Sequence, residues 1–91
     1  MIKAMFLAPT YEQAKFHARE LGFHNPKEWK FIRDIQDVEG FNLKEMPIYR
    51  VGGFMLDRKQ MDVMDYLDWK GIELIFPIQE GRYDTGEYNR T

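Results

Sequence analysis

Thr10 and the pair Gly52-Gly53 are the residues of this chain whose types and positions best suit ligand chemistry. Thr10 follows an apolar segment and precedes a helical pattern, so its hydroxyl and the free amides of a helix N-terminus could hold a phosphate or a carboxylate. The two glycines follow a second apolar segment and would let a ligand approach the backbone. If the two segments are neighbouring parallel strands, both positions lie at the carboxyl edge of one sheet, where α/β folds bind ligands. The candidate ligand-binding residues are Thr10, Tyr11, Gln13, Gly52, Gly53 and Arg58.

These residues also have a purely structural interpretation. Threonine is a common helix N-cap, and paired glycines commonly turn the chain at the end of a strand. Because this architecture uses such caps and turns routinely, the structural interpretation is the more frequent one.

The residue types that enzymes use as nucleophiles or metal ligands are scarce. The chain contains no serine and no cysteine, which excludes a serine nucleophile, thiol catalysis, disulfides and thiolate metal sites. His17 and His24 lack a third ligand at a recognisable spacing, and Asp62, Asp65 and Asp68 recur every three residues as one solvated helix face. The sequence therefore predicts no catalytic residues, no metal and no cofactor, and favours a protein that is not an enzyme.

The charge balance bears on nucleic-acid binding. Thirteen Lys and Arg against 15 Asp and Glu give a net charge of -2. Non-specific binding to nucleic acid depends on a basic surface, so the composition gives it weak support. Nucleic-acid binding could act only through a local basic patch, for which the candidates are Lys15, Arg19, Arg58 and Lys59.

Aromatic residues exceed what a small core needs. The chain has seven Phe, five Tyr and two Trp, and exposed aromatic clusters often mark interfaces. Tyr83 and Tyr88 fall in a polar C-terminal stretch that could be a docking arm, while Met61 and Met64 could serve a core or a contact between two copies. These four residues are the candidate interface for a protein partner or a homodimer.

The elements that must position these residues follow from hydrophobic spacing. Ninety-one residues suit one domain, which we expect over residues 1–78, with a polar tail at 79–91. The predicted strands are Ile2–Ala8, Trp29–Ile32, Ile48–Val51 and Ile72–Phe76, the last extending to Ile78 if Pro77 lies on an edge. Ile35–Met46 is a short helical turn or an ordered loop. The first predicted helix is Tyr11–Leu21, and the second is capped by Asp57, presents Met61, Met64 and Leu67 on one stripe and ends at Gly71.

Strands that alternate with helices favour a parallel sheet with right-handed crossovers. The sequence therefore predicts an α/β fold, a small Rossmann-like sandwich with two main helices and a four-stranded, mostly parallel sheet. The continuously apolar strands at Ile2 and Ile48 should be central and those at Trp29 and Ile72 should lie at the edges, in the order 2-1-3-4.

Residues Ala8 to Ala14 contain Ala-Pro-Thr followed by Gln-Ala, which resembles an element in the motor domains of terminases and helicases. The phosphate loop of those motors, Gly-x-x-x-x-Gly-Lys-Ser/Thr, is absent, so nucleotide hydrolysis is not expected. With Trp29, Gly40 and Val51-Gly52, the chain as a whole resembles small proteins of tailed bacteriophages. That resemblance implies a fold and a phage origin but carries no activity.

Together these observations predict a non-enzymatic, phage-type protein that acts by binding a protein partner or a second copy. The alternative is a domain that binds a nucleotide, phosphate or other small ligand in the crevice at Thr10 and Gly52-Gly53. The apolar run Ile2–Ala8 is too short to span a bilayer, and we expect no membrane association and a cytoplasmic location, in the host cell if the gene is viral.

Overall fold

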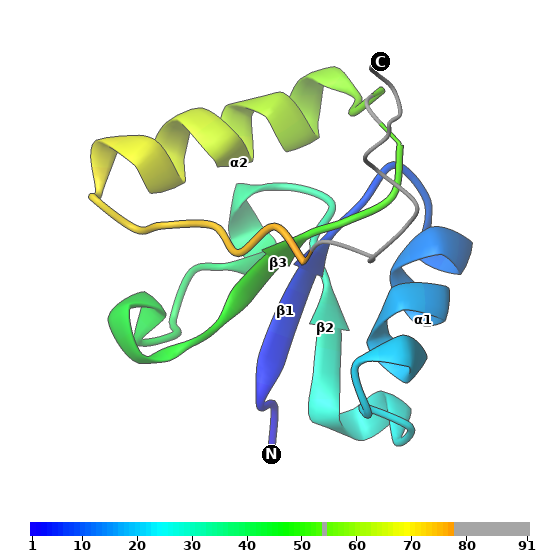
Figure 1. Ribbon diagram of the computed structural model, residues 1–91. Coiled ribbons are helices and arrows are strands. Elements are labelled where there is room, and N and C mark those ends of the chain that lie inside the picture. Colours follow the sequence, from blue (N-terminus) through cyan, green and yellow to red (C-terminus); the bar gives the residue numbers. More distant parts are fainter. Residues whose placement is uncertain (54, 78–91) are drawn as a thin grey trace.

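The computed structural model describes residues 1–53 and 55–77. Within them the chain forms a mixed α/β fold in which two helices flank a three-stranded parallel sheet (Figure 1). The strands are β1 (Ala4–Leu7), β2 (Trp29–Phe31) and β3 (Ile48–Arg50), and the helices are α1 (Tyr11–Glu20) and α2 (Arg58–Trp69). Tyr83, Tyr88 and the predicted tail at 79–91 lie outside the described residues.

β1 lies in the middle of the sheet. Its four residues are all buried, as expected for an apolar strand covered on both faces. Met5 lies opposite Lys30 of β2 and Ile48 of β3, with both pairings parallel. The strand order β2-β1-β3 confirms the predicted order of the first three strands and places β2 at one edge. β3, which was predicted to be central, lies at the other edge of the three-stranded sheet.

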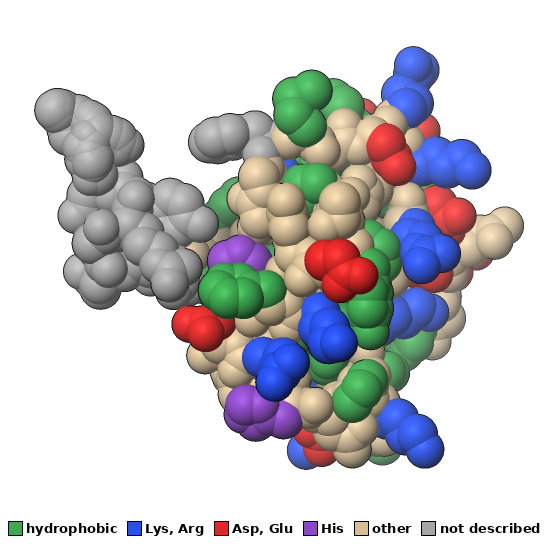
Figure 2. Space-filling view, turned by 90° about the vertical axis from the view of Figure 1, so that its right-hand side faces the viewer, with side chains coloured by type: hydrophobic (Ala, Val, Ile, Leu, Met, Phe, Trp, Pro, Cys, Tyr) green, Lys and Arg blue, Asp and Glu red, His purple; other side chains and the backbone are tan. Residues whose placement is uncertain are grey.

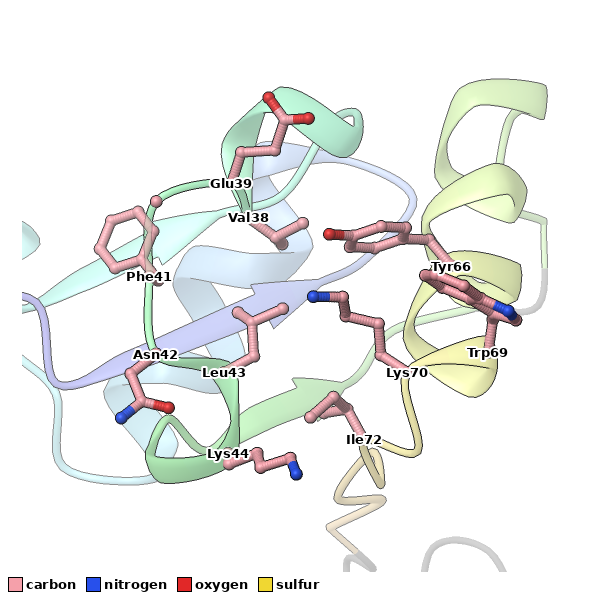
Figure 3. A pocket seen from close by; sticks show the side chains of 11 residues that line it. Val38, Glu39, Phe41, Asn42, Leu43, Lys44, Tyr66, Trp69, Lys70 and Ile72 are labelled. Atoms are coloured by element: carbon pink, nitrogen blue, oxygen red, sulfur yellow. The ribbon is translucent and has the colours of Figure 1, made fainter.

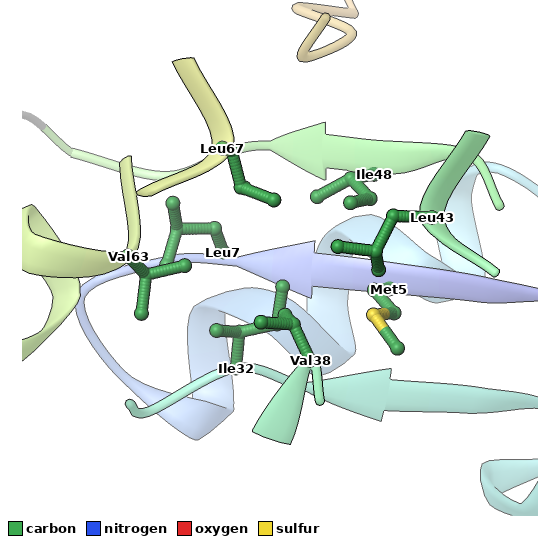
Figure 4. Packing of buried hydrophobic residues seen from close by; sticks show 8 residues of the cluster. All are labelled: Met5, Leu7, Ile32, Val38, Leu43, Ile48, Val63 and Leu67. Atoms are coloured by element: carbon green, nitrogen blue, oxygen red, sulfur yellow. The ribbon is translucent and has the colours of Figure 1, made fainter. Parts of the chain in front are cut away.

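One face of the sheet packs against α2. The buried side chains between this face and the helix form a cluster that we call the α2-side cluster (Figure 4). Met5 and Leu7 of β1 belong to it, and Val63 and Leu67 come from the helix. Burying a side chain of this size is worth about 1.5–3 kcal/mol, so this layer is a main source of stability. The buried members of the cluster are Met5, Leu7, Ile32, Val38, Leu43, Ile48, Val63 and Leu67.

The opposite face packs against α1 (Figure 1). Ala14 and Ala18 are fully buried, and their short side chains let the helix lie close to the sheet over Phe6. Thr10 is the N-cap, as predicted, and the helix ends at Glu20, one residue before the predicted end. Sequence spacing was sufficient to predict this helix, because its capping residues and its apolar stripe indicate nearly the same range.

α2 is rotated relative to the prediction. Its buried residues are Gln60, Val63 and Leu67, whereas Met61 is 54% exposed and Met64 is only partly buried against the α2-side cluster. The predicted stripe is therefore wrong at Met61, because a polar residue holds the buried position beside it. Within the described residues, neither helix is long and apolar enough to cross a bilayer.

The predicted fourth strand, Ile72–Phe76, forms one parallel bridge in place of a strand. Ile75 donates to the carbonyl of Ile48 at 2.8 Å and accepts from the amide of Arg50 at 2.9 Å. Both bonds lie on the edge of β3 that faces away from β1, since Tyr49 pairs inward with β1. Pro77, which has no N–H, cannot continue the pairing.

The predicted irregular segment, Ile35–Met46, contains two single-turn 3₁₀ helices, η2 (Ile35–Asp37) and η3 (Leu43–Glu45). The Asp37 carboxylate accepts from the amides of Arg33 at 2.7 Å and Asp34 at 3.2 Å, which holds the first turn in place. The segment thus matches the predicted helical turn, formed twice and joined by a loop. The loop carries residues 38–44 to a position opposite the C-terminal end of α2 (Figure 1).

Candidate functional site

The structure brings Thr10, Gln13, Gly52 and Gly53 together at the carboxyl ends of β1 and β3, as the topology predicted. The Thr10 hydroxyl, however, accepts from the amide of Gln13 at 3.2 Å, so it acts as a helix cap. The Gln13 side-chain oxygen accepts from the amide of Gly53 at 3.1 Å. The donors and acceptors expected to hold a ligand therefore bind one another.

Gly52 makes this contact possible. Its φ of 82° lies in the left-handed region that favours glycine. A Cβ at this position would meet the side-chain oxygen of Gln13 and would lie 3.0 Å from Cδ of Pro9. The space beside Gly52 is thus occupied by the Gln13 side chain. This agrees with the structural interpretation of the two glycines and not with ligand binding.

Arg50 closes the loop that follows β3. Its guanidinium donates to the carbonyls of Val51 at 2.6 Å and Gly53 at 2.7 Å. Burial lowers the pKa of Arg50 from its ordinary value. The sequence analysis did not identify Arg50 as a residue of this edge.

Tyr11 and Arg58 do not join the crevice. The Tyr11 ring stacks on Trp29 with 5.6 Å between centroids and meets the edge of Phe31 at 5.8 Å. The Arg58 side chain is 91% exposed, with its Nε 3.9 Å from Oδ1 of Asp62 one turn later. The structure therefore supports four of the six predicted ligand residues as neighbours.

Gln60 joins α2 to the same edge of the sheet and was missed at the sequence level. Its side-chain nitrogen donates to the carbonyls of Ala8 at 2.6 Å and Ile32 at 3.1 Å, and its oxygen accepts from the amide of Asp57 at 3.2 Å. The buried amide is thus fully satisfied, and two carbonyls just after β1 and β2 gain partners. Only the Asp-x-x-Gln spacing of a capping box hinted at it.

A separate hollow lies between residues 38–44 and the C-terminal end of α2 (Figure 3). Its volume is about 490 Å³. Its rim carries Trp69, which is 78% exposed, and Tyr66, whose ring centroid lies 6.3 Å from that of Trp69. We call it the α2 hollow; it is lined by Val38, Glu39, Gly40, Phe41, Asn42, Leu43, Lys44, Tyr66, Trp69, Lys70 and Ile72.

Two lysines give the α2 hollow its charge. The Lys70 side chain extends into it, with Nζ 5.6 Å from the centroid of the Tyr66 ring, and Lys44 lies at its opposite margin (Figure 3). Glu39 is the one acidic residue of the lining. Sequence analysis did not identify this site, because residues 38–44 and 66–72 meet only in the folded chain; its one local signal is the Tyr-x-x-Trp-Lys spacing.

The other predicted surface residues are dispersed. Met61 is exposed and Met64 is partly buried, so the two do not form one exposed methionine face. Figure 2 shows the side of the molecule that carries α1, where basic side chains are interspersed with acidic and hydrophobic ones. Lys15 and Arg19 are exposed on α1, and Arg58 and Lys59 begin α2. Among the described residues no group of three metal-ligating side chains comes together.

Known proteins add no further assignment to this geometry. Comparison of the chain with protein-family models, curated proteins and solved structures finds no match, so its resemblance to bacteriophage proteins stays a prediction.

Proposed function

We propose that this chain is a non-enzymatic interaction protein that holds a segment of a protein partner in the α2 hollow. The observation that carries this proposal is the exposed Trp69 beside Tyr66 at the rim of a hollow of about 490 Å³. Trp and Tyr are enriched among the residues that dominate binding energy at protein interfaces.

The packing of the two tryptophans supports the proposal. Trp29 is 5% exposed and packs in the buried cluster between the sheet and α1, whereas Trp69 is 78% exposed at the end of α2. A tryptophan that the core does not need is available to a partner, and its large rigid ring loses little conformational entropy on binding.

The crevice at the carboxyl ends of the strands has less support. Gln13 already occupies the space above Gly52 and bonds the amide of Gly53. A phosphate would have to displace that side chain and replace its hydrogen bond.

At the level of the fold, we interpret the chain as a reduced Rossmann-like sandwich. The parallel bridge of Ile75 to β3 supports a fourth strand position in the order 2-1-3-4. The Ala-Pro-Thr-x-x-Gln-Ala element supports a bacteriophage origin and hence a place in the host cytoplasm.

Peptide display tests the proposed function. A random-peptide library is selected on the immobilised full chain, and the enriched peptides are measured against the variants Trp69→Ala and Phe16→Ala. Phe16 is a matched control because it is a 49% exposed aromatic residue on α1, on the opposite side of the sheet. We expect Trp69→Ala to weaken binding by about tenfold or more and Phe16→Ala to leave it unchanged.

Two results would contradict the proposal. One is enrichment of peptides that bind both variants equally. The other is a concentration-dependent dimer in sedimentation velocity that Trp69→Ala dissociates, which would make the occupant of the α2 hollow a second copy of this chain.

A further inference from the structure

We propose that the partner segment bound in the α2 hollow is acidic, with carboxylates facing Lys44 and Lys70 and an apolar or aromatic side chain against Tyr66 and Trp69. This inference rests on the proposed function and names the chemistry of the partner.

The charge of the lining supports an anionic occupant. The chain as a whole has a net charge of -2, yet the α2 hollow is lined by two lysines and a single glutamate. Lys70 reaches into the hollow toward Leu43, whereas the Glu39 carboxylate is directed away from it (Figure 3). A negative group entering the hollow therefore meets both ammonium groups first.

Neither ammonium is neutralised within the described part of the chain. The ion pairs there join Lys3 to Glu28, Lys30 to Asp37 and Arg58 to Asp62, and no carboxylate pairs with Lys44 or Lys70. The contact that Lys70 does make, over the Tyr66 ring, leaves its N–H donors available for a carboxylate. Two such contacts can form without the loss of an existing salt bridge.

The remaining surface of the α2 hollow suits an apolar anchor. Val38, Leu43 and Ile72 contribute aliphatic side chains from three different segments, and Tyr66 and Trp69 add two rings at the rim. A volume of about 490 Å³ accommodates a few side chains of a peptide. This combination of an apolar centre with charged groups at its margin is the usual anatomy of a protein interface.

A nucleic-acid strand fits this surface less well. Asp65 and Asp68 lie on α2 next to Trp69 and line the adjoining hollow. Regularly spaced phosphates running out of the α2 hollow would meet these carboxylates, whereas a peptide can place its acids only where the lysines are. Charge complementarity therefore favours a short acidic segment of a protein.

Isothermal titration calorimetry on the full chain tests the inference with two defined peptides. The acidic probe is acetylated Glu-Glu-Leu-Phe-Glu, and the neutral probe is acetylated Gln-Gln-Leu-Phe-Gln. We expect the acidic peptide to bind about tenfold more tightly at low salt, with the difference shrinking as salt is raised. The double variant Lys44→Gln/Lys70→Gln should bind both peptides equally.

The matched control is Lys15→Gln/Lys27→Gln, which removes two exposed lysines from α1 and the turn before β2 and should keep the preference. All these lysines are exposed, so thermal unfolding midpoints should match that of the parent chain.

The outcomes separate the two proposals. Equal binding of the two peptides by the parent chain, or a preference that survives the Lys44→Gln/Lys70→Gln change, overturns the acidic partner while leaving a Trp69-dependent docking surface. If a ten-residue oligothymidylate binds through the same lysines and the peptides do not, the occupant is nucleic acid and both proposals are wrong. If the Trp69→Ala variant binds the peptides as tightly as the parent chain does, the proposed function itself is wrong.

Discussion

Single side chains decide what the carboxyl edge of this sheet can do. Gln13 links α1 to the loop after β3, a sequence separation of 40 residues, through one hydrogen bond to Gly53. That bond exists because Gly52 has no side chain to block it. The residues that looked most like a ligand cradle therefore hold two elements together.

Gly52→Ala tests this interpretation. Gly52 and Gly22 both have a left-handed φ, 82° and 95°, but of the two only Gly52 would bring an added Cβ against other atoms. Gly22→Ala should cost about 1 kcal/mol of unfolding free energy for the strained φ alone. Gly52→Ala should cost about 1 kcal/mol more, because Gln13 must leave Gly53.

Urea denaturation of the two variants, with Gly53→Ala as a nearly neutral third, measures the difference. Gly53 has no positive φ, and a Cβ added there would meet no other atom within 4 Å. Equal losses for Gly52→Ala and Gly22→Ala would mean that the bond between Gln13 and Gly53 contributes nothing.

At the scale of elements, α2 is joined to the sheet by a polar contact as well as by its apolar face. Gln60 is 2% exposed and holds the carbonyls that follow β1 and β2. The capping residue Asp57 predicted where α2 begins, but hydrophobic spacing could not predict this orientation. Met61 and Val63 are equally acceptable as core residues in a local pattern, and the carbonyl partners of Gln60 lie 28 and 52 residues away in sequence.

Gln60→Glu should make the stability of the protein depend on pH. Burial beside two carbonyl oxygens disfavours the charged carboxylate, so the pKa of the new glutamate is raised in the folded state above its unfolded value of about 4.3. The unfolded state then binds fewer protons than the folded state, and stability falls as pH rises above about 4. At pH 7 the variant should have lost at least about 2 kcal/mol.

Denaturation at pH 3.5 and pH 7 measures this loss, with Gln36→Glu as the control at an exposed position. Gln36→Glu should show the pH dependence of the parent chain. An identical dependence in Gln60→Glu would show that position 60 is open to water.

The first three strands, the capped start of each helix and the proximity of Thr10 to the two glycines could be predicted, because they follow from local spacing and from the geometry of parallel sheets. The α2 hollow could not. Phe41, Leu43 and Lys44 belong to a segment whose single 3₁₀ turns carry little local signal, and Trp69 acquires its neighbours only when that segment folds against α2.

At the scale of the whole molecule, both core clusters lie within the part of the chain that ends at Leu74. The side chains of the two clusters, including those partly buried, come from residues between Ala4 and Leu74. The sheet separates the clusters, and β1 contributes to both. The described part of the chain thus holds a two-layered core around one central strand.

A chain ending at residue 78 should therefore unfold cooperatively. The slope of its unfolding free energy against urea concentration should be close to that of the full chain, since this slope scales with the surface exposed on unfolding. Its unfolding free energy should differ by no more than about 0.5 kcal/mol. A shallow or strongly shifted transition would mean that residues 79–91 contribute to the core, against the predicted domain boundary.

The short strands on either side of β1 also bear on how this protein behaves at high concentration. β2 and β3 have three residues each, and Pro77 follows the single bridge beside β3. An edge this brief, ended by a residue without an N–H, gives the backbone of a neighbouring molecule few groups to pair with. We therefore expect the folded protein to offer little opportunity for edge-to-edge pairing between neighbouring molecules.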